Sequence, residues 1–156
     1  MNRGHFDLAV SQIERALEIN PSDAKSLAQR GAILVWAGRA TDALPWIQGA
    51  LRLDPTDART AFYLGMMDYF LAQYSDALPA LDRALSGNLG RNTQLMGRCF
   101  LAAAYAQLQR QQDADRERAA VMRLAPFLDA KRFASQFGTQ EARDLMLEGL
   151  KKAGFR

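Results

Sequence analysis

Small and apolar residues recur along this chain at helical spacing. In the first such segment Ala9, Ile13 and Ala16 stand at positions i, i+4 and i+7, and Pro21 ends the run. This spacing places the three side chains on one face of a helix, and a proline after the run terminates it. The same frame returns twice, as Ala43, Ile47, Ala50 and as Ala77, Leu81, Ala84. The pattern predicts an all-α chain whose helices cross closely, because alanines let two helix backbones approach.

The helical segments are copies of one another at a distance of 34 residues. Residues 16–24 (ALEINPSDA) return as residues 50–58 (ALRLDPTDA). Gly31 and Gly65 are also 34 residues apart, each in an otherwise helical run. A glycine there costs about 1 kcal/mol relative to alanine, so we expect both to serve close packing. A period near 34 predicts a solenoid built from stacked helix pairs.

These residues resemble the tetratricopeptide repeat. The resemblance rests on Leu64-Gly65, Tyr74, Ala77, Leu81 and Ala84 in the clearest unit, and on Gly31, Gly38, Ala43, Ile47, Ala50 and Pro55 in the unit before. It covers residues 4 to about 128 and implies a right-handed α-solenoid of antiparallel helix pairs. The implied units are a half repeat at 1–23 and repeats at 24–57, 58–94 and 95–128.

The repeat frame also predicts two irregularities. Residues 4–7 would form the turn between paired helices, so the chain would open on a second helix without its partner. That is expected of a fragment of a longer array, and a shorter natural start is the alternative. Residues 86–92 replace the Asn-Pro or Asp-Pro turn of the earlier units, and the helix after them is expected three residues out of register.

The repeat pattern stops after Pro126. Residues 129–156 are expected to form a C-terminal capping segment, with an amphipathic helix at 140–153. The tail resembles the end of the tetratricopeptide region of bacterial class III adenylate/guanylate cyclases, and comparable tails follow some bacterial transcriptional activators. This resemblance implies a larger parent protein. The matching stretches are residues 123–127, 132–137 and 147–154.

Composition and charge narrow the function classes. The 156 residues are 49% hydrophobic and 24% charged, and no run approaches the roughly 18 apolar residues of a membrane span. No signal-peptide core is present, so we expect a cytoplasmic protein with no membrane partner. Residues 1–94 hold 9 basic and 10 acidic side chains, for a net charge of −1, while residues 95–156 hold 11 and 7, for +4. The signs are interspersed, which favours a solvated helical surface over a nucleic-acid partner.

The sequence holds no catalytic constellation. His5 is the only histidine and Cys99 the only cysteine, so neither a cysteine-based zinc site nor an internal disulfide can form. Cys99 is expected to be buried as a small apolar residue. The glycines at 87–90 lack the preceding strand and the following lysine of a phosphate-binding loop. We therefore expect no enzyme activity, no cofactor and no metal.

The first helix of each pair should line the concave side of the array. We expect an apolar and aromatic groove with a basic edge there, suited to a helix or peptide. The candidate partner-binding residues are Lys25, Trp36, Arg59, Phe62, Met66, Tyr69 and Phe70. An alternative interpretation assigns Phe62, Met66 and Phe70 to packing between successive pairs. Aromatic side chains that remain exposed would indicate a partner site.

The predicted function is a non-catalytic protein–protein interaction module, because stacked helix pairs usually present binding surfaces. Together with the tail, this implies the C-terminal regulatory or scaffolding domain of a larger bacterial signalling protein, such as an adenylate/guanylate cyclase. The partner would be a protein or peptide, for example the upstream part of the same parent chain. The alternatives are a homodimerisation module and the arm of a transcriptional regulator.

Overall fold

Helices joined by short turns make up the part of the chain that the structure describes. The computed structural model describes the backbone of residues 3–156 and the side chains from Val10 onward. This part contains nine helices and confirms the all-α prediction. They are α1 (Arg3–Ile19), α2 (Ala24–Trp36), α3 (Ala40–Leu53), α4 (Ala58–Phe70), α5 (Tyr74–Ser86), α6 (Arg91–Gln107), α7 (Gln111–Leu124), α8 (Ala130–Ala134) and α9 (Gln140–Lys152).

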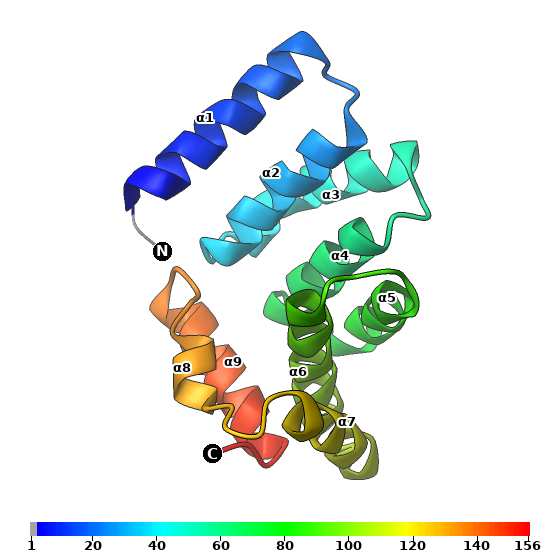
Figure 1. Cartoon of the computed structure of the whole chain (residues 1–156), viewed down its shortest axis with the longest axis vertical. Helices are drawn as coiled ribbons and strands as arrows, with labels where there is room; N and C mark the ends of the chain where they lie inside the picture. The colour runs from blue at the N-terminus through cyan, green and yellow to red at the C-terminus, as the bar shows by residue number, and fades with distance from the viewer. Residues whose placement is uncertain (1–2) are drawn as a thin grey trace.

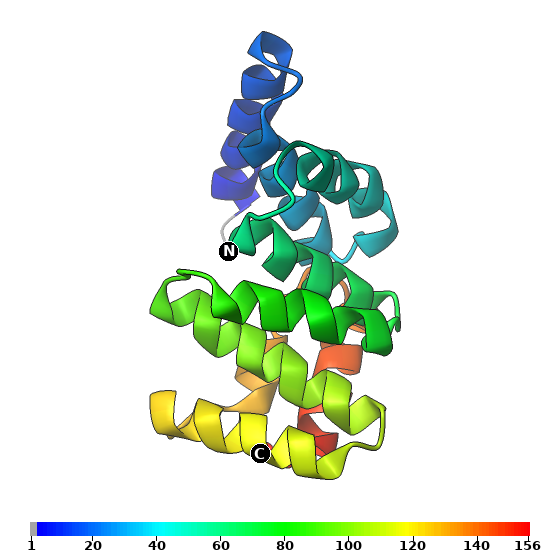
Figure 2. The same cartoon turned by 90° about the vertical axis from the view of Figure 1, so that its right-hand side faces the viewer.

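The helices stack as antiparallel pairs, α2 with α3, α4 with α5 and α6 with α7, and each pair packs on the next (Figure 1). Figure 2 shows the same stack from the side, with α1 at one end and α7 at the other. The turn expected at residues 4–7 is wrong, because α1 is continuous from Arg3 to Ile19. Gly4 weakens a helix but does not end one, and no proline stands nearby to do so.

Gly31 and Gly65 make the close helix crossings that their positions predict. A Cβ atom at Gly31 would lie 2.5 Å from Cγ1 of Ile47, and one at Gly65 would lie 2.5 Å from Cγ of Leu81. Each first helix therefore needs a glycine where its second helix presents a large side chain. Ile47 and Leu81 are both fully buried. The 34-residue period thus repeats a packing contact.

The first helix of each complete pair ends in the same left-handed turn. Gly38, Ala72 and Gln109 have φ angles of 78°, 57° and 61°. In each case the next N–H donates to a carbonyl five residues earlier, as Gln73 N does to Asp68 O at 2.8 Å. This arrangement satisfies carbonyls that the helix end leaves free. Glycine adopts the conformation without strain, whereas alanine at position 72 pays roughly 1 kcal/mol for it.

The third pair is longer than the other two. Helices α3, α5 and α7 begin at Ala40, Tyr74 and Gln111, which are 34 and 37 residues apart, so the predicted slip of three residues is confirmed. Helix α6 is four residues longer than α4, with 17 against 13, and α5 is one residue shorter than α3, with 13 against 14, which together give the three residues. The lengthened helix is also the one on which α9 packs.

After α7 the chain turns back toward the first pair. We call residues 125–156 the C-terminal segment. It contains α8 and α9, and both lie on the side of the array that α2, α4 and α6 line (Figure 1). The predicted amphipathic helix at 140–153 is confirmed as α9, which extends from Gln140 to Lys152. The C-terminal segment reaches further than a cap on the last repeat would, since its Gly138 N–H donates to the carbonyl of Trp36 at 2.8 Å.

Candidate partner-binding surfaces

The residues predicted to form a concave groove do lie together on α2 and α4, but most of them are covered. Phe62 is 3% exposed, and Met66 and Tyr69 are fully buried. The rings of Trp36 and Phe70 are half-buried. The expectation that Phe62, Met66 and Tyr69 face an open groove is therefore wrong for this structure. The basic edge, made of Lys25 and Arg59, remains exposed.

Phe137 of the C-terminal segment covers the aromatic part of the groove. Its ring stacks on Trp36 with centroids 4.9 Å apart and an interplanar angle of 10°. The same ring meets Phe70 edge-on at 4.9 Å and Phe100 at 6.0 Å. Such pairs add about 0.5–1.5 kcal/mol beyond the burial of their area. One side chain from the C-terminal segment thus joins α2, α4 and α6.

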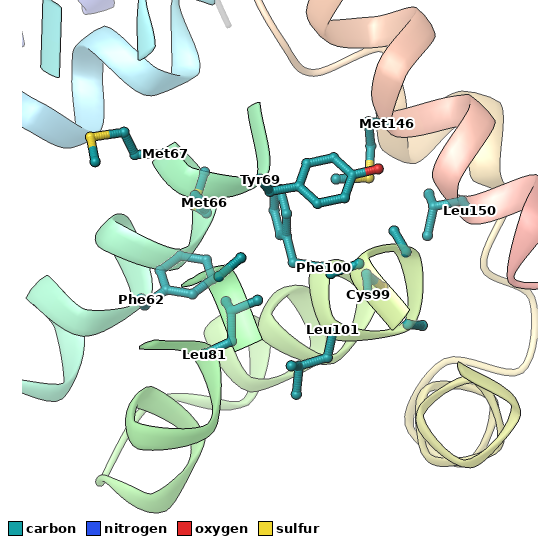
Figure 3. Packing of buried hydrophobic residues seen from close by; sticks show 14 of the residues in the cluster. Phe62, Met66, Met67, Tyr69, Leu81, Cys99, Phe100, Leu101, Met146 and Leu150 are labelled. Atoms are coloured by element: carbon teal, nitrogen blue, oxygen red, sulfur yellow. The ribbon is translucent and has the colours of Figure 1, made fainter. Parts of the chain in front are cut away.

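Helix α9 covers Tyr69 and α6. Figure 3 shows Met146 and Leu150 facing Tyr69, Cys99 and Phe100 across this contact. The Tyr69 hydroxyl donates a hydrogen bond to the Leu145 carbonyl at 3.2 Å. Burial is the main cause that raises the pKa of Tyr69 above its usual range, so the hydroxyl remains a donor at every working pH.

The C-terminal segment is part of the core because it buries large apolar side chains. Phe133 is 8% exposed, Phe137 is 2% exposed, and Met146 and Leu150 are fully buried. Burial of one such side chain contributes about 1.5–3 kcal/mol, so the four together contribute on the order of 6–12 kcal/mol before chain entropy is counted. The alternative interpretation, which assigns Phe62, Met66 and Phe70 to packing, is confirmed for Phe62 and Met66, and the half-buried Phe70 packs against the same core. Tyr69, which that interpretation did not include, is buried with them.

A second surface lies at the other end of the array, between α1, α2 and α3. Two adjoining depressions of about 420 and 460 Å³ meet there at Pro21, Leu27 and Trp46. We call this surface the Trp46 hollow. Its lining consists of Glu14, Leu17 and Glu18 of α1, Pro21 and Ser22 of the following turn, Leu27 and Arg30 of α2, and Pro45, Trp46, Gly49, Arg52 and Leu53 of α3.

Trp46 is the centre of this hollow. The ring is half-buried, and the guanidinium carbon of Arg30 lies 5.6 Å from its centroid. Arg30 also donates to Glu14 on α1 at 2.6 Å. A cation held over an indole ring and a carboxylate behind it fix the orientation of both side chains. Leu53, at the edge of the hollow, is 50% exposed.

The hollow is specific to the first pair, and the sequence prediction missed it. In the 34-residue frame Ala80 stands where Trp46 does, and Arg83 stands where Gly49 does. Trp46 is therefore a large residue at a position that the next repeat fills with a small one. That departure from the repeat is the sequence signal that could have indicated the hollow.

Asp68 is an unusual residue in the buried part of α4. It is 6% exposed, and Leu34 stands at the equivalent position of the first pair. Burial, and to a smaller extent the charge of Asp76, raise the pKa of Asp68 to about 6. The carboxylate therefore ionises near neutral pH at a free-energy cost to the folded state.

The described residues offer little for catalysis. Cys99 is fully buried, and burial raises the pKa of its thiol to about 12, so it is not a thiolate nucleophile at neutral pH. The side chain of His5 lies outside the described residues. No group of three or more His, Cys, Asp or Glu side chains that could hold a metal occurs from Val10 onward. None of the described helices is long and apolar enough to cross a membrane.

Comparison with known proteins gives matches among solved structures. No protein-family model and no curated protein matches the chain. The structure of MamA superimposes with a TM-score of 0.67 at 21% identity, over 97% of this chain and 88% of that one. PilF of Pseudomonas aeruginosa gives 0.70 at 20% identity, over 99% and 71%. YrrB, described as a TPR protein with an unusual peptide-binding site, gives 0.64 at 24% identity, over 96% and 77%.

The chain has a tetratricopeptide-repeat (TPR) fold. At these identities the likeness concerns the fold, which agrees with the repeat frame and the paired helices. TPR arrays are scaffolds for protein–protein interaction.

Proposed function

We propose that this TPR protein is a non-catalytic interaction module that binds a segment of a partner protein in the Trp46 hollow. The observation that carries the proposal is the hollow itself, an apolar depression formed by three helices around a half-buried tryptophan. Tryptophan and arginine are the residue types that most often dominate binding energy at protein interfaces. Arg30, held across the ring of Trp46, supplies the second of them.

The hollow is open without any change in the fold, and the concave groove is not. Binding in the groove would require the C-terminal segment to leave, which exposes four buried apolar side chains at a cost on the order of 6–12 kcal/mol. Binding in the hollow adds a partner to a surface that is already formed, which lowers the cost of association. The groove residues predicted from the sequence are thus the less favourable candidate site.

The lining predicts the chemistry of the bound segment. Leu17, Leu27 and Trp46 form an apolar floor that suits one bulky apolar side chain. Charged groups of both signs stand at the rim, with Glu18 on one side and Arg52 on the other. A short segment with an aromatic or branched apolar anchor and neighbouring charged residues matches this arrangement.

Selection of random displayed peptides on the full chain tests the site. Peptides that bind are expected to carry a bulky apolar residue and to lose at least about tenfold in affinity on Trp46→Ala. Ala80 at the equivalent position indicates that alanine is compatible with the fold there. Arg59→Ala, on the exposed edge of the concave side, is the matched control and should change nothing. Peptides that depend on Arg59 and not on Trp46 would place binding on the concave side instead.

The finer hypothesis concerns the parent protein. We propose that the chain is the C-terminal arm of a bacterial signalling protein such as an adenylate/guanylate cyclase, and the support is the resemblance of residues 123–154 to such tails. The coding sequence upstream of Met1 tests this directly. A nucleotide cyclase domain there would support it, and a DNA-binding domain would favour the arm of a transcriptional regulator.

A further inference from the structure

Phe127 is exposed in a way that the fold does not require. Its side chain is 97% exposed, more than any other large apolar side chain among the described residues. It follows Pro126 in the turn after α7, and the same place after Pro21 and Pro55 holds a serine and a threonine. Those two turns thus carry a hydroxyl residue where this one carries a phenylalanine. An exposed aromatic side chain indicates a contact with another molecule where it belongs to a contiguous apolar patch.

The surroundings of Phe127 form an exposed apolar patch with charged residues at its rim. Met122 on α7 is 36% exposed, and Pro126 is exposed beside it. Depressions of about 600 and 490 Å³ lie on the two sides of the ring. The exposed charged neighbours are Arg123, Arg132 and Asp129, whose carboxylate accepts a hydrogen bond from the Arg132 N–H at 2.6 Å. We call Met122, Arg123, Pro126, Phe127 and Arg132 the Phe127 knob.

The knob and the Trp46 hollow lie at opposite ends of the array. The turn after α7 is at one end of the long axis, and α1 with the first pair is at the other (Figures 1 and 2). One chain therefore cannot insert its own knob into its own hollow. A contact between the two surfaces must join two molecules, and such heterologous contacts form a ring where the rotation between successive copies closes and an open filament where it does not.

We propose that the partner of the Trp46 hollow is a second copy of this chain, which inserts Phe127. The inference rests on the proposed function and names its occupant. The knob offers the bulky apolar anchor that the hollow requires. One charge contact is available on the α1 side of the hollow, where the exposed Glu18 can face Arg123 or Arg132, since Glu14 is already paired with Arg30. Opposite charges at the rim set the register of a contact more than its strength.

Three single variants of the full chain probe the contact by sedimentation equilibrium. Phe127→Ser removes the anchor and restores the residue type of the earlier turns. Gly49→Arg fills the hollow, and a Cβ atom there would lie 3.5 Å from Leu27 Cδ1, an ordinary contact distance. Arg83 at the equivalent position shows that the repeat accommodates an arginine. Gln48→Arg, exposed on the same helix and outside the hollow, is the charge-matched control.

The wild-type chain should show a weight-average mass above that of the monomer, rising between about 10 and 500 µM. Phe127→Ser and Gly49→Arg should each raise the dissociation constant by about thirtyfold, and Gln48→Arg should leave it unchanged. A wild-type chain that stays monomeric over this range would overturn the inference. Association that persists in a folded Phe127→Ser variant would do the same.

Mixing the two defective variants gives the decisive result. The Gly49→Arg chain keeps its knob and the Phe127→Ser chain keeps its hollow, so an equimolar mixture should form a dimer and stop there. A mixture that stays monomeric, or that grows beyond the dimer, contradicts a head-to-tail contact between these surfaces. If the chain is monomeric but displayed peptides still require Trp46, the hollow serves a different protein and the proposed function stands alone.

Discussion

Asp68 gives the stability of this protein an unusual dependence on pH. The folded-state pKa is about 6, against 3.8 for the free side chain. Since the folded state holds the proton more tightly, protonation of Asp68 stabilises the fold, and this stabilisation is fully present below the unfolded pKa and lost as pH rises through 6. Between pH 4.5 and pH 7.5 the folded and unfolded pKa values of Asp68 give a loss of about 2 kcal/mol in unfolding free energy, because a difference of one pKa unit corresponds to about 1.4 kcal/mol.

Asp68→Asn isolates this contribution, because asparagine has a similar shape and no charge. The difference in unfolding free energy between the variant and the wild type should change by about 2 kcal/mol in favour of the variant as pH rises from 4.5 to 7.5. Urea unfolding followed by circular dichroism measures it. Asp76→Asn should lower the pKa of Asp68, so that the loss of stability occurs at lower pH. The loss should persist, because burial is the larger cause of the raised pKa. A difference between Asp68→Asn and wild type that does not change with pH would refute the reasoning.

Three further changes test the packing contacts. Ala72→Gly should stabilise the chain by about 0.5–1 kcal/mol in thermal unfolding, because it relieves the left-handed strain at φ 57°. Gly65→Ala should cost about 1–3 kcal/mol because its methyl group meets the facing helix, while Gly90→Ala, at the N-cap of α6 with nothing within 4 Å, should cost less than about 1 kcal/mol in the same assay. Phe137→Ala should cost about 3–5 kcal/mol in urea unfolding and alter tryptophan fluorescence, whereas the exposed Phe127→Ser should change stability by less than about 0.5 kcal/mol.

Local periodicity was sufficient to predict the fold. Each helix pair repeats the same short-range contacts, such as that of Gly31 with Ile47, and these are encoded within one 34-residue frame. The three-residue slip was also visible, because it changes the spacing along the chain. The turn expected at residues 4–7 failed since a lone glycine is a weak helix terminator. Repeat sequences are therefore informative about contacts between neighbouring helices.

The candidate site could not be predicted in the same way. Trp36 and Phe137 are 101 residues apart, and no periodic pattern relates them. The aromatic residues of α2 and α4 look alike in sequence whether a partner or the chain itself covers them. The Trp46 hollow was missed for a different reason. The repeat pattern is built from positions that agree between units, and Trp46 is a position where the first pair differs from the second.

In the described part of the chain, the most exposed large apolar side chains lie near the two ends of the array, whereas the concave groove between the ends is covered. Ile19 and Leu53 are 80% and 50% exposed near the hollow, and Phe127 is 97% exposed beyond α7. The C-terminal segment contributes to two of these features, because it covers the concave side with Phe137 and presents Phe127 from its first turn. Docking of the segment thus closes the groove and positions the knob together. If the segment were released, the groove would open and the knob would lose its fixed place, so groove binding and head-to-tail contact would exclude each other in one molecule.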